Sequence, residues 1–185
     1  MNGAELRQAL EAHHRDAWGW ALACCARHPL DAETVLQTAY LKILEGKARF
    51  SGHSSFRTWL FAVVRNTASD HRRREWRNRL RLTRHAEGAP PVAARSFEDD
   101  VYRSQVQSHF LRALAGLPRR QQEALQLVFY HDLSLAEAAD VMGISIGSAR
   151  THYERGKKQL RRLMAASGVF DEPELGRAEN QAVVP

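Results

Sequence analysis

The chain has 185 residues, of which 44% are hydrophobic, so it can form a packed core and is not a wholly disordered protein. Lys and Arg outnumber Asp and Glu by 27 to 21, a formal charge of +6. The segment from Arg65 to Arg84 contains eight arginines and two acids, so it alone carries +6 and the rest of the chain is about neutral. This local basic charge indicates a polyanionic partner.

Composition also excludes several classes of protein. The two cysteines, Cys24 and Cys25, are adjacent and provide no disulfide framework, which fits a reducing compartment. No signal peptide is recognisable and no apolar run is long enough to span a bilayer, so we expect a cytoplasmic protein without membrane insertion. No HExxH, CxxC pair or P-loop motif occurs, and nothing completes a metal site around Cys24 and His28. We therefore expect no enzyme activity, no cofactor and no metal.

Apolar residues recur at helical spacing along the chain, while strand patterns are nearly absent, which predicts an all-α fold. The face of a first helix would contain Leu6, Leu10, Ala17, Ala21 and Cys24. Asp31 is the expected N-cap of a second helix, which Gly46 ends. A third helix is predicted to begin near Ser54 or Ser55 and to run into the arginine-rich stretch.

Aromatic residues just before and at the start of this third helix are followed by basic residues. Phe50, Phe56, Trp59 and Phe61 precede Arg65, Asn66 and the run HRRREWRNRLR. Arginines that hold phosphates, beside rings or pockets that receive unstacked bases, suit melted DNA. The competing interpretation places the aromatics in the core, which we favour for Phe56, Trp59 and Leu60, and the arginines on a solvated face. The density of the Arg72–Arg81 run favours nucleic-acid contact over solvation.

The segment 85–104 contains Gly88, Pro90 and Pro91 and cannot form one continuous helix. We interpret it as a flexible linker between two small helical domains, residues 1–84 and 105–165. Residues 166–185 are predicted to form an acidic tail, to which the sequence assigns no role.

A second motif lies at LSLAEAADVMGISIGSARTHYERGKKQLRRLM, residues 133–164. Ser134 and Glu137 have the spacing of a capping box, Gly143 is placed for a left-handed helix end, and Ser145 can cap the next helix. Helix, short turn and helix form the helix-turn-helix layout, whose second helix enters the major groove of DNA.

On a helical wheel the second helix of this motif has one apolar and one basic face. The apolar face contains Ile146, Ala149, Tyr153, Gly156, Leu160 and Leu163, and the opposite face contains Ser148, Thr151, Arg155, Lys158 and Arg162. Arginine can bind guanine edges and phosphates, and short hydroxyls can bind phosphates or bases. The competing interpretation is an ordinary solvated face of an amphipathic helix.

Together the two halves resemble the extracytoplasmic-function sigma factors of bacterial RNA polymerase. The N-terminal signature is DAETVLQTAYLKIL followed by FSGHSSFRTWLFAVVRNTASDHRRR, and the C-terminal one is LPRRQQEALQLVFYHDLSLAEAADVMGISIGSARTHYERGKKQLRRL. Their order, spacing and intervening linker match the two-domain plan of the family over about residues 10 to 165. One departure is Thr38 after Gln37, where family members often carry an acid.

The resemblance implies that the first domain is sigma region 2 and the second is sigma region 4. Such a protein binds the polymerase core, at the clamp of its largest subunit, and directs promoter-specific initiation by recognising a minus-ten and a minus-thirty-five element and aiding promoter melting. The resemblance puts core binding at Leu36, Gln37 and Tyr40. It puts the minus-ten contact near Asn66 and Asp70, and we add the basic residues Arg65, Arg72, Arg73 and Arg74. It puts the minus-thirty-five contact at Arg150, Thr151, His152 and Arg155.

The wheel supports Thr151 and Arg155 independently, adds Ser148 and Lys158, and leaves Arg150 on the flank of the basic face. The expected partners are core polymerase, promoter DNA and, as a candidate, an anti-sigma factor, with the protein at the nucleoid when it is bound to polymerase. The main alternative is a helix-turn-helix regulator that is not a polymerase subunit. Such a regulator would bind its duplex site alone, and it leaves FRTWLF and the arginine run without a function.

Overall fold

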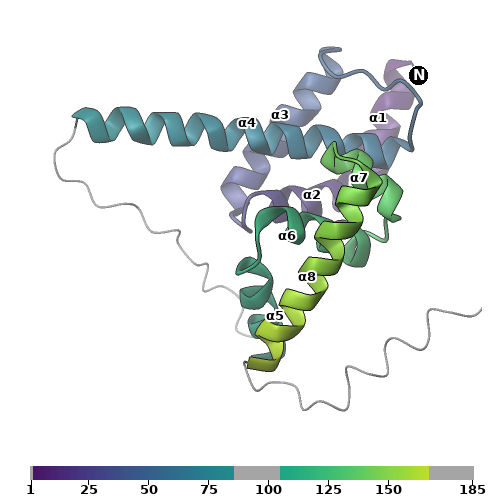
Figure 1. Ribbon diagram of the computed structural model, residues 1–185. Coiled ribbons are helices and arrows are strands. Elements are labelled where there is room, and N and C mark those ends of the chain that lie inside the picture. The colour runs from purple at the N-terminus through teal and green to yellow at the C-terminus, as the bar shows by residue number, and fades with distance from the viewer. Residues whose placement is uncertain (1, 86–104, 167–185) are drawn as a thin grey trace, which may run out of the picture.

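The computed structural model describes residues 2–85 and 105–166, with side chains from 2 to 81 and from 108 to 166. All regular elements in these ranges are helices, which confirms the all-α prediction. The N-terminal half (residues 2–85) contains α1 (Gly3–Ala12), α2 (His14–Cys24), α3 (Pro29–Leu44) and α4 (Phe56–His85) (Figure 1). The C-terminal half (residues 105–166) contains α5 (Gln105–Ala115), α6 (Arg119–Leu125), a π-helical turn η1 (Gln126–Tyr130), α7 (Leu135–Met142) and α8 (Ile146–Ala166).

Two expectations lie beyond these ranges. The predicted linker at 85–104 and the acidic tail at 166–185 fall outside the described residues, apart from the helix-end residues His85 and Ala166. Within the described part of the chain, no helix is both long enough and apolar enough to cross a membrane.

The start of the chain differs from the prediction in two ways. The single first helix is two helices, because His13 leaves helical geometry at φ −104° and ψ 7° and separates α1 from α2. The prediction of Asp31 as an N-cap is also wrong, because His28 holds that position and Pro29 is the first helical residue. Proline is suited to that place, since it has no N–H to leave unpaired and its φ is already helical. Gly46, with φ +72°, follows α3 as predicted.

The helix α4 begins where the sequence predicts, since the Ser55 hydroxyl accepts a hydrogen bond of 3.1 Å from the Thr58 backbone N–H. With 30 residues it is about 45 Å long, and its second half extends as an arm beyond the rest of the molecule (Figure 1). Its first half has buried side chains on one side, including Leu60, Phe61 and Val64. One helix therefore contributes both a core element and a free basic arm.

The helix-turn-helix is formed by α7 and α8. The capping box between Ser134 and Glu137 is present, and Gly143 has the predicted left-handed conformation at φ +62°. The Ser145 hydroxyl accepts from the Ser148 backbone N–H at 3.2 Å and so caps α8. The prediction that Ile146 lies on the core face is wrong: it is 51% exposed, because it stands in the first turn of α8, ahead of the first buried position, Ala149.

The two halves share one hydrophobic core, which the sequence did not predict. Trp20 and Phe61 of the N-terminal half stack at 5.8 Å between ring centroids, and the Trp20 indole donates a hydrogen bond of 3.0 Å to the Phe61 carbonyl. Leu127 and Met142 of the C-terminal half belong to the same buried cluster, and α7 packs directly on α4. The predicted domain bounds stay a prediction, but the halves they separate pack as immediate neighbours.

Candidate nucleic-acid and protein interfaces

An exposed polar stripe runs along α4 and contains Asn66, Asp70, Arg73 and Arg74; we call it the α4 stripe. Residues three and four apart on a helix are neighbours, so Asn66, Asp70 and Arg73 follow one another along one side. Lys42 of α3 fixes the middle of the stripe, since its Nζ lies 3.2 Å from Asp70 Oδ2 and 3.3 Å from Thr67 Oγ1. Four of the six residues predicted for minus-ten contact therefore share one accessible surface.

The other two predicted minus-ten residues make contacts inside the molecule. Arg65 is half-buried, and its Nε lies 2.9 Å from Oε2 of Glu123 on α6. Arg72 donates a hydrogen bond of 3.0 Å to the Cys24 carbonyl at the end of α2. In this arrangement both guanidinium groups are engaged with protein, and their contact with DNA stays a prediction.

Three aromatic rings form a cluster at the start of the α4 stripe. Phe50, Phe56 and Trp59 lie with ring centroids 5.2 to 5.5 Å apart. Leu60 is fully buried, as predicted, whereas Phe56 and Trp59 are only half-buried and keep part of their surface accessible. Half-exposed rings beside an amide and arginines can stack with unpaired bases.

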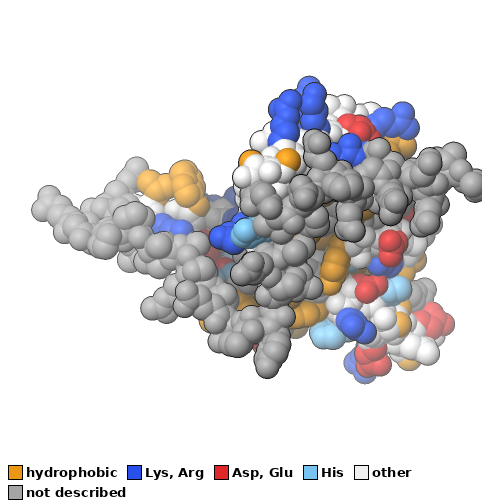
Figure 2. Space-filling model, turned by 90° about the horizontal axis from the view of Figure 1, so that it is seen from below, with side chains coloured by type: hydrophobic (Ala, Val, Ile, Leu, Met, Phe, Trp, Pro, Cys, Tyr) orange, Lys and Arg blue, Asp and Glu red, His pale blue; other side chains and the backbone are white. Residues whose placement is uncertain are grey.

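The second candidate surface is the outer side of α8. Five of its six predicted contact residues are exposed, and the sixth, His152, is half-buried; the exposed ones are Ser148, Arg150, Thr151, Arg155 and Lys158. Ser148 accepts a hydrogen bond of 2.9 Å from Ser145, and the Thr151 hydroxyl donates one of the same length to the Gly147 carbonyl. In Figure 2 Lys and Arg side chains gather at the top edge of this face, and others are scattered over the rest of it.

Close packing on α6 holds α8 in place. Gly156 is buried, and a Cβ atom added to it would lie 3.1 Å from Leu125 Cδ1 and 3.2 Å from Leu125 Cγ. Tyr153 stacks on Phe129 at 5.5 Å between ring centroids. Glu154, the acid within the exposed length of α8, is paired with Lys157 at 3.3 Å. The helix is thus anchored on one side while its opposite side stays open and basic.

The three predicted polymerase-binding residues come together in a third place. Leu36, Gln37 and Tyr40 line one hollow of about 390 Å³ with His14 and Trp18 of α2. The Tyr40 hydroxyl lies 3.1 Å from His14 Nδ1, and burial raises the pKa of Tyr40 to about 12. Gln37 is exposed and Leu36 is 4% exposed, so a partner would contact mainly the polar rim.

Sequence reasoning missed the side chains that join the two halves. Glu123 is 5% exposed and lies between two arginines, Arg65 and Arg119, at 2.9 and 2.8 Å. His131 is 2% exposed, and its ring centroid lies 5.7 Å from that of Trp20 and 4.8 Å from that of Phe61. Burial lowers the pKa of His131 to about 4, so it is neutral at neutral pH. A buried acid in a polar run gives no periodic signal, so no sequence pattern could have identified Glu123.

Among the described residues no three side chains able to bind a metal ion come together.

Comparison with known proteins identifies both halves. Residues 9–78 match the family "Sigma-70 region 2", and residues 109–160 match "Sigma-70, region 4". The chain is 33% identical over 166 residues to the ECF RNA polymerase sigma factor SigC of Mycobacterium tuberculosis, covering 86% of this chain and 83% of that one. This chain belongs to the RNA polymerase sigma factors of the extracytoplasmic-function (ECF) group.

Other relatives agree with this assignment. The ECF sigma factor SigF of Caulobacter vibrioides is 34% identical and covers 76% of this chain and 75% of its own, and YlaC of Bacillus subtilis is 30% identical and covers 76% and 81%. Among solved structures, the sigma factor RpoE in complex with the anti-sigma factor NepR from Bartonella quintana has a similar fold, with a TM-score of 0.68 and 23% identity over 87% of this chain and 97% of that one. The alternative of a helix-turn-helix regulator that is not a polymerase subunit is not favoured.

Proposed function

We propose that this sigma factor divides promoter recognition between α8 and the α4 stripe, and binds core polymerase through the hollow between α2 and α3. The observation that carries the proposal is the presence of two separate exposed surfaces, each on the half that matches the corresponding sigma region. Each surface combines cationic side chains with short polar groups.

For the minus-thirty-five element, the groove-reading residues are Arg155 and Thr151, with Ser148 and His152 beside them and Arg150 and Lys158 at the edges. Arg155 has the side chain best suited to guanine, because two of its N–H groups can donate hydrogen bonds to O6 and N7 of the same base. Lys158 lies one turn further along the helix and is placed for phosphate, which positions a helix without reading sequence.

For the minus-ten element, the melted strand lies along the α4 stripe. Asn66 offers an amide to the edge of an unstacked base, and Asp70 accepts from exocyclic amines once Lys42 is displaced. Arg73 and Arg74 hold phosphates, and Trp59 with Phe56 offers ring surface for stacking. Arg65 and Arg72 can bind the strand only after their contacts with Glu123 and with the Cys24 carbonyl are broken.

Core polymerase is the obligatory partner, and we assign the clamp of its largest subunit to the rim formed by Gln37, Tyr40 and Leu36. An anti-sigma factor is the second expected class of partner, because the similar sigma factor RpoE from Bartonella quintana was solved in complex with the anti-sigma factor NepR. We place the protein in the cytoplasm, at the nucleoid when it is bound to polymerase, and we assign it no catalytic step.

Transcription from a promoter library with purified core polymerase tests the proposal. Core polymerase alone should give no discrete starts, and addition of this chain should give specific transcripts without an ATP-hydrolysing activator. Aligning the selected promoters should then show two conserved elements. Core polymerase that binds the chain but starts at no discrete position would contradict the proposal.

A further inference from the structure

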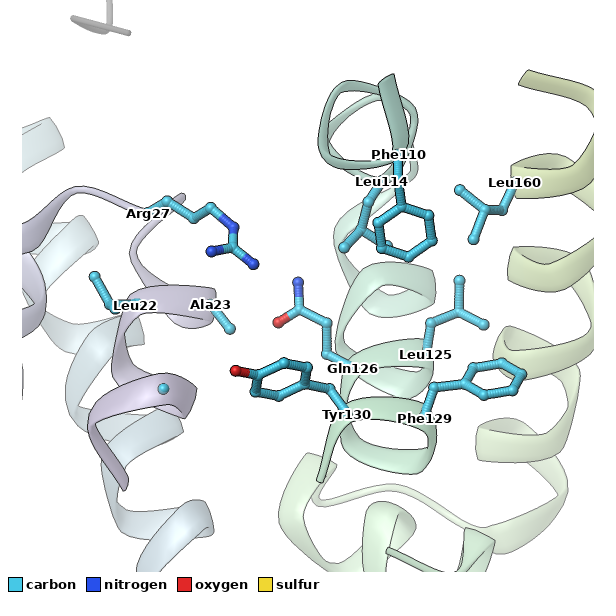
Figure 3. Close-up of a pocket in the computed structure, with 11 residues that line it drawn as sticks. Leu22, Ala23, Arg27, Phe110, Leu114, Leu125, Gln126, Phe129, Tyr130 and Leu160 are labelled. Atoms are coloured by element: carbon cyan, nitrogen blue, oxygen red, sulfur yellow. The ribbon is translucent and has the colours of Figure 1, made fainter. Parts of the chain in front are cut away.

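A hollow of about 390 Å³ lies between the end of α2 and the helices of the C-terminal half (Figure 3). Its wall is mainly apolar, and on the C-terminal side it consists of Phe110, Leu114, Leu125, Phe129 and Leu160. Two of these side chains stay accessible, since Phe110 is 42% and Phe129 is 62% exposed. An accessible, concave and largely apolar surface of this size is typical of a site for a small organic ligand.

The polar groups of the hollow gather on the side of α2. Figure 3 shows the Arg27 guanidinium, the Gln126 amide and the Tyr130 hydroxyl on this side, while Phe110 and Leu160 lie on the opposite side. Among the described residues that line the hollow, Arg27 alone is charged, and none is an acid. The hollow therefore has a cationic end and an apolar end, which complement a ligand with an anionic head and a hydrocarbon tail.

The backbone that presents Arg27 to the hollow is strained. Ala26 and Arg27 follow the end of α2 at φ +51° and +62°, in the left-handed region that favours glycine. The Arg27 N–H donates a hydrogen bond of 2.8 Å to the Leu22 carbonyl, and Leu22 also lines the hollow. Glycine would form this turn without strain but would supply no side chain. Strain retained at a residue that faces a cavity is typical of functional sites.

We propose that this hollow is a binding site for a medium-chain fatty acid, with the carboxylate at Arg27 and the hydrocarbon chain against Phe110 and Leu160. A guanidinium can donate two parallel hydrogen bonds to one carboxylate, and Gln126 and Tyr130 can donate to its remaining lone pairs. Burial of the chain removes apolar surface of both ligand and protein from water. The site lies apart from the α4 stripe and from the outer side of α8, so the proposal does not depend on how the protein binds DNA.

Three ligands of equal chain length test the role of the head group by titration calorimetry on the full chain at neutral pH. Decanoate should bind with a Kd on the order of tens of micromolar. Decanol should bind about tenfold more weakly, because it offers no charge to Arg27, and decyltrimethylammonium should not bind measurably. Equal binding of decanol and decanoate would overturn the proposal and indicate a hollow that receives an apolar side chain of a partner protein. Absence of decanoate binding at millimolar concentration would also overturn it.

Chain length tests whether the hydrocarbon tail lies in a space of limited size. Affinity should rise about tenfold from octanoate to decanoate, because two more methylene groups are buried. It should change little from dodecanoate to hexadecanoate, because the hollow is then filled. A steady rise over the whole series would indicate adsorption to the protein surface and would contradict a defined site.

Matched variants locate the site on the protein. Arg27→Gln should weaken decanoate binding about tenfold and leave decanol binding unchanged. The control is Arg15→Gln, which removes the same charge from an exposed position of α2 that does not line the hollow, and it should change neither. Equal losses of decanoate affinity in the two variants would mean that the net charge of the region attracts the ligand and that Arg27 does not bind it.

A third variant fills the hollow. The Ala23 side chain points into it, so Ala23→Phe should abolish binding of both decanoate and decanol while circular dichroism shows a folded chain. Unchanged decanoate binding by folded Ala23→Phe would place the ligand elsewhere and overturn the proposal. If Ala23→Phe does not fold, the comparison of Arg27→Gln with Arg15→Gln decides.

Discussion

The two long helices α4 and α8 both carry residues that we propose to bind DNA, yet their basic side chains are placed differently. On α8 the predicted arginines, Arg150 and Arg155, are both exposed. On α4 two of the four predicted arginines are engaged inside the molecule, Arg65 with Glu123 and Arg72 with the Cys24 carbonyl. A count of arginines in a sequence therefore overstates the charge that a long helix offers to DNA.

The two engaged arginines also differ from each other. The partner of Arg72 lies in the same half of the chain, so that bond depends on packing within the N-terminal half. The partner of Arg65 lies in the other half, so that ion pair joins the two halves. Single substitutions can therefore test the core packing, the contacts between the halves and the proposed DNA-binding surfaces of α4 and α8 separately.

The largest effect is expected from Phe61→Ala on α4. Phe61 is fully buried and contacts Trp20 and His131, so its loss leaves a cavity where the two halves meet. We expect about 3–5 kcal/mol less stability in urea unfolding, the usual cost of removing a core phenylalanine. The control is Tyr153→Ala on α8, a half-buried ring that should cost less. Similar losses of stability for both variants would mean that the shared core contributes no more to folding than the contact of α8 with η1.

The stability of the protein should depend on pH through His131, which is buried beside Trp20 and Phe61. Burial, and next the charge of Arg57, lowers its pKa from 6.5 to about 4, while Asp16 and Asp132 act in the opposite direction. The unfolded chain binds the proton more readily, so stability falls as pH falls from about 6.5 to about 4, by about 3 kcal/mol in total. Urea unfolding across this range should show the slope, and His131→Phe should flatten it. Parallel profiles for the two proteins would assign the pH dependence to carboxylates such as Glu137, whose pKa is lowered chiefly by its hydrogen bond from the Ser134 backbone.

A smaller effect is expected from Arg155→Ala on α8. Because Arg155 is exposed and its loss removes no core atom, the fold should be retained in circular dichroism. Holoenzyme affinity should fall by about 1–3 kcal/mol, with relaxed preference at one base of the upstream element. Lys158→Ala should weaken all sequences alike. An equal loss at every base for Arg155→Ala would show that Arg155 touches phosphate only.

The smallest effect is expected from the free arginines of α4. Arg73→Gln with Arg74→Gln should reduce the log–log salt slope of holoenzyme binding by about 1.4 to 1.8, since each phosphate contact contributes about 0.7 on a single strand and about 0.9 on duplex DNA. Arg72→Gln should reduce it less, because Arg72 is bound to the Cys24 carbonyl. A larger change for Arg72→Gln than for the double variant would show that this internal bond breaks on DNA.

Much of the structure follows from short-range signals in the sequence. The capping box of Ser134 and Glu137, the left-handed Gly143 and the start of α4 at Ser55 depend on residues no more than a few positions apart, and all were predicted. The exposed face of α8 follows from helical periodicity in the same way. The errors at His13, Asp31 and Ile146 occur at helix ends, where several residues can cap or break a helix and neighbouring elements decide which one does.

Which surfaces meet was decided by tertiary structure alone. Helical periodicity indicates that one side of α4 is buried, but it does not identify α7 as the element that covers part of it, because the covering residues are more than 70 positions away, as with Thr58 and Glu137. The burial of Glu123 and His131 has the same origin: neither is apolar, and each contacts groups of the other half, the Arg65 guanidinium for Glu123 and the rings of Trp20 and Phe61 for His131. The sequence by itself determined the family, the helices and the outward face of α8, whereas long-range packing determined which arginines of α4 remain free to bind DNA.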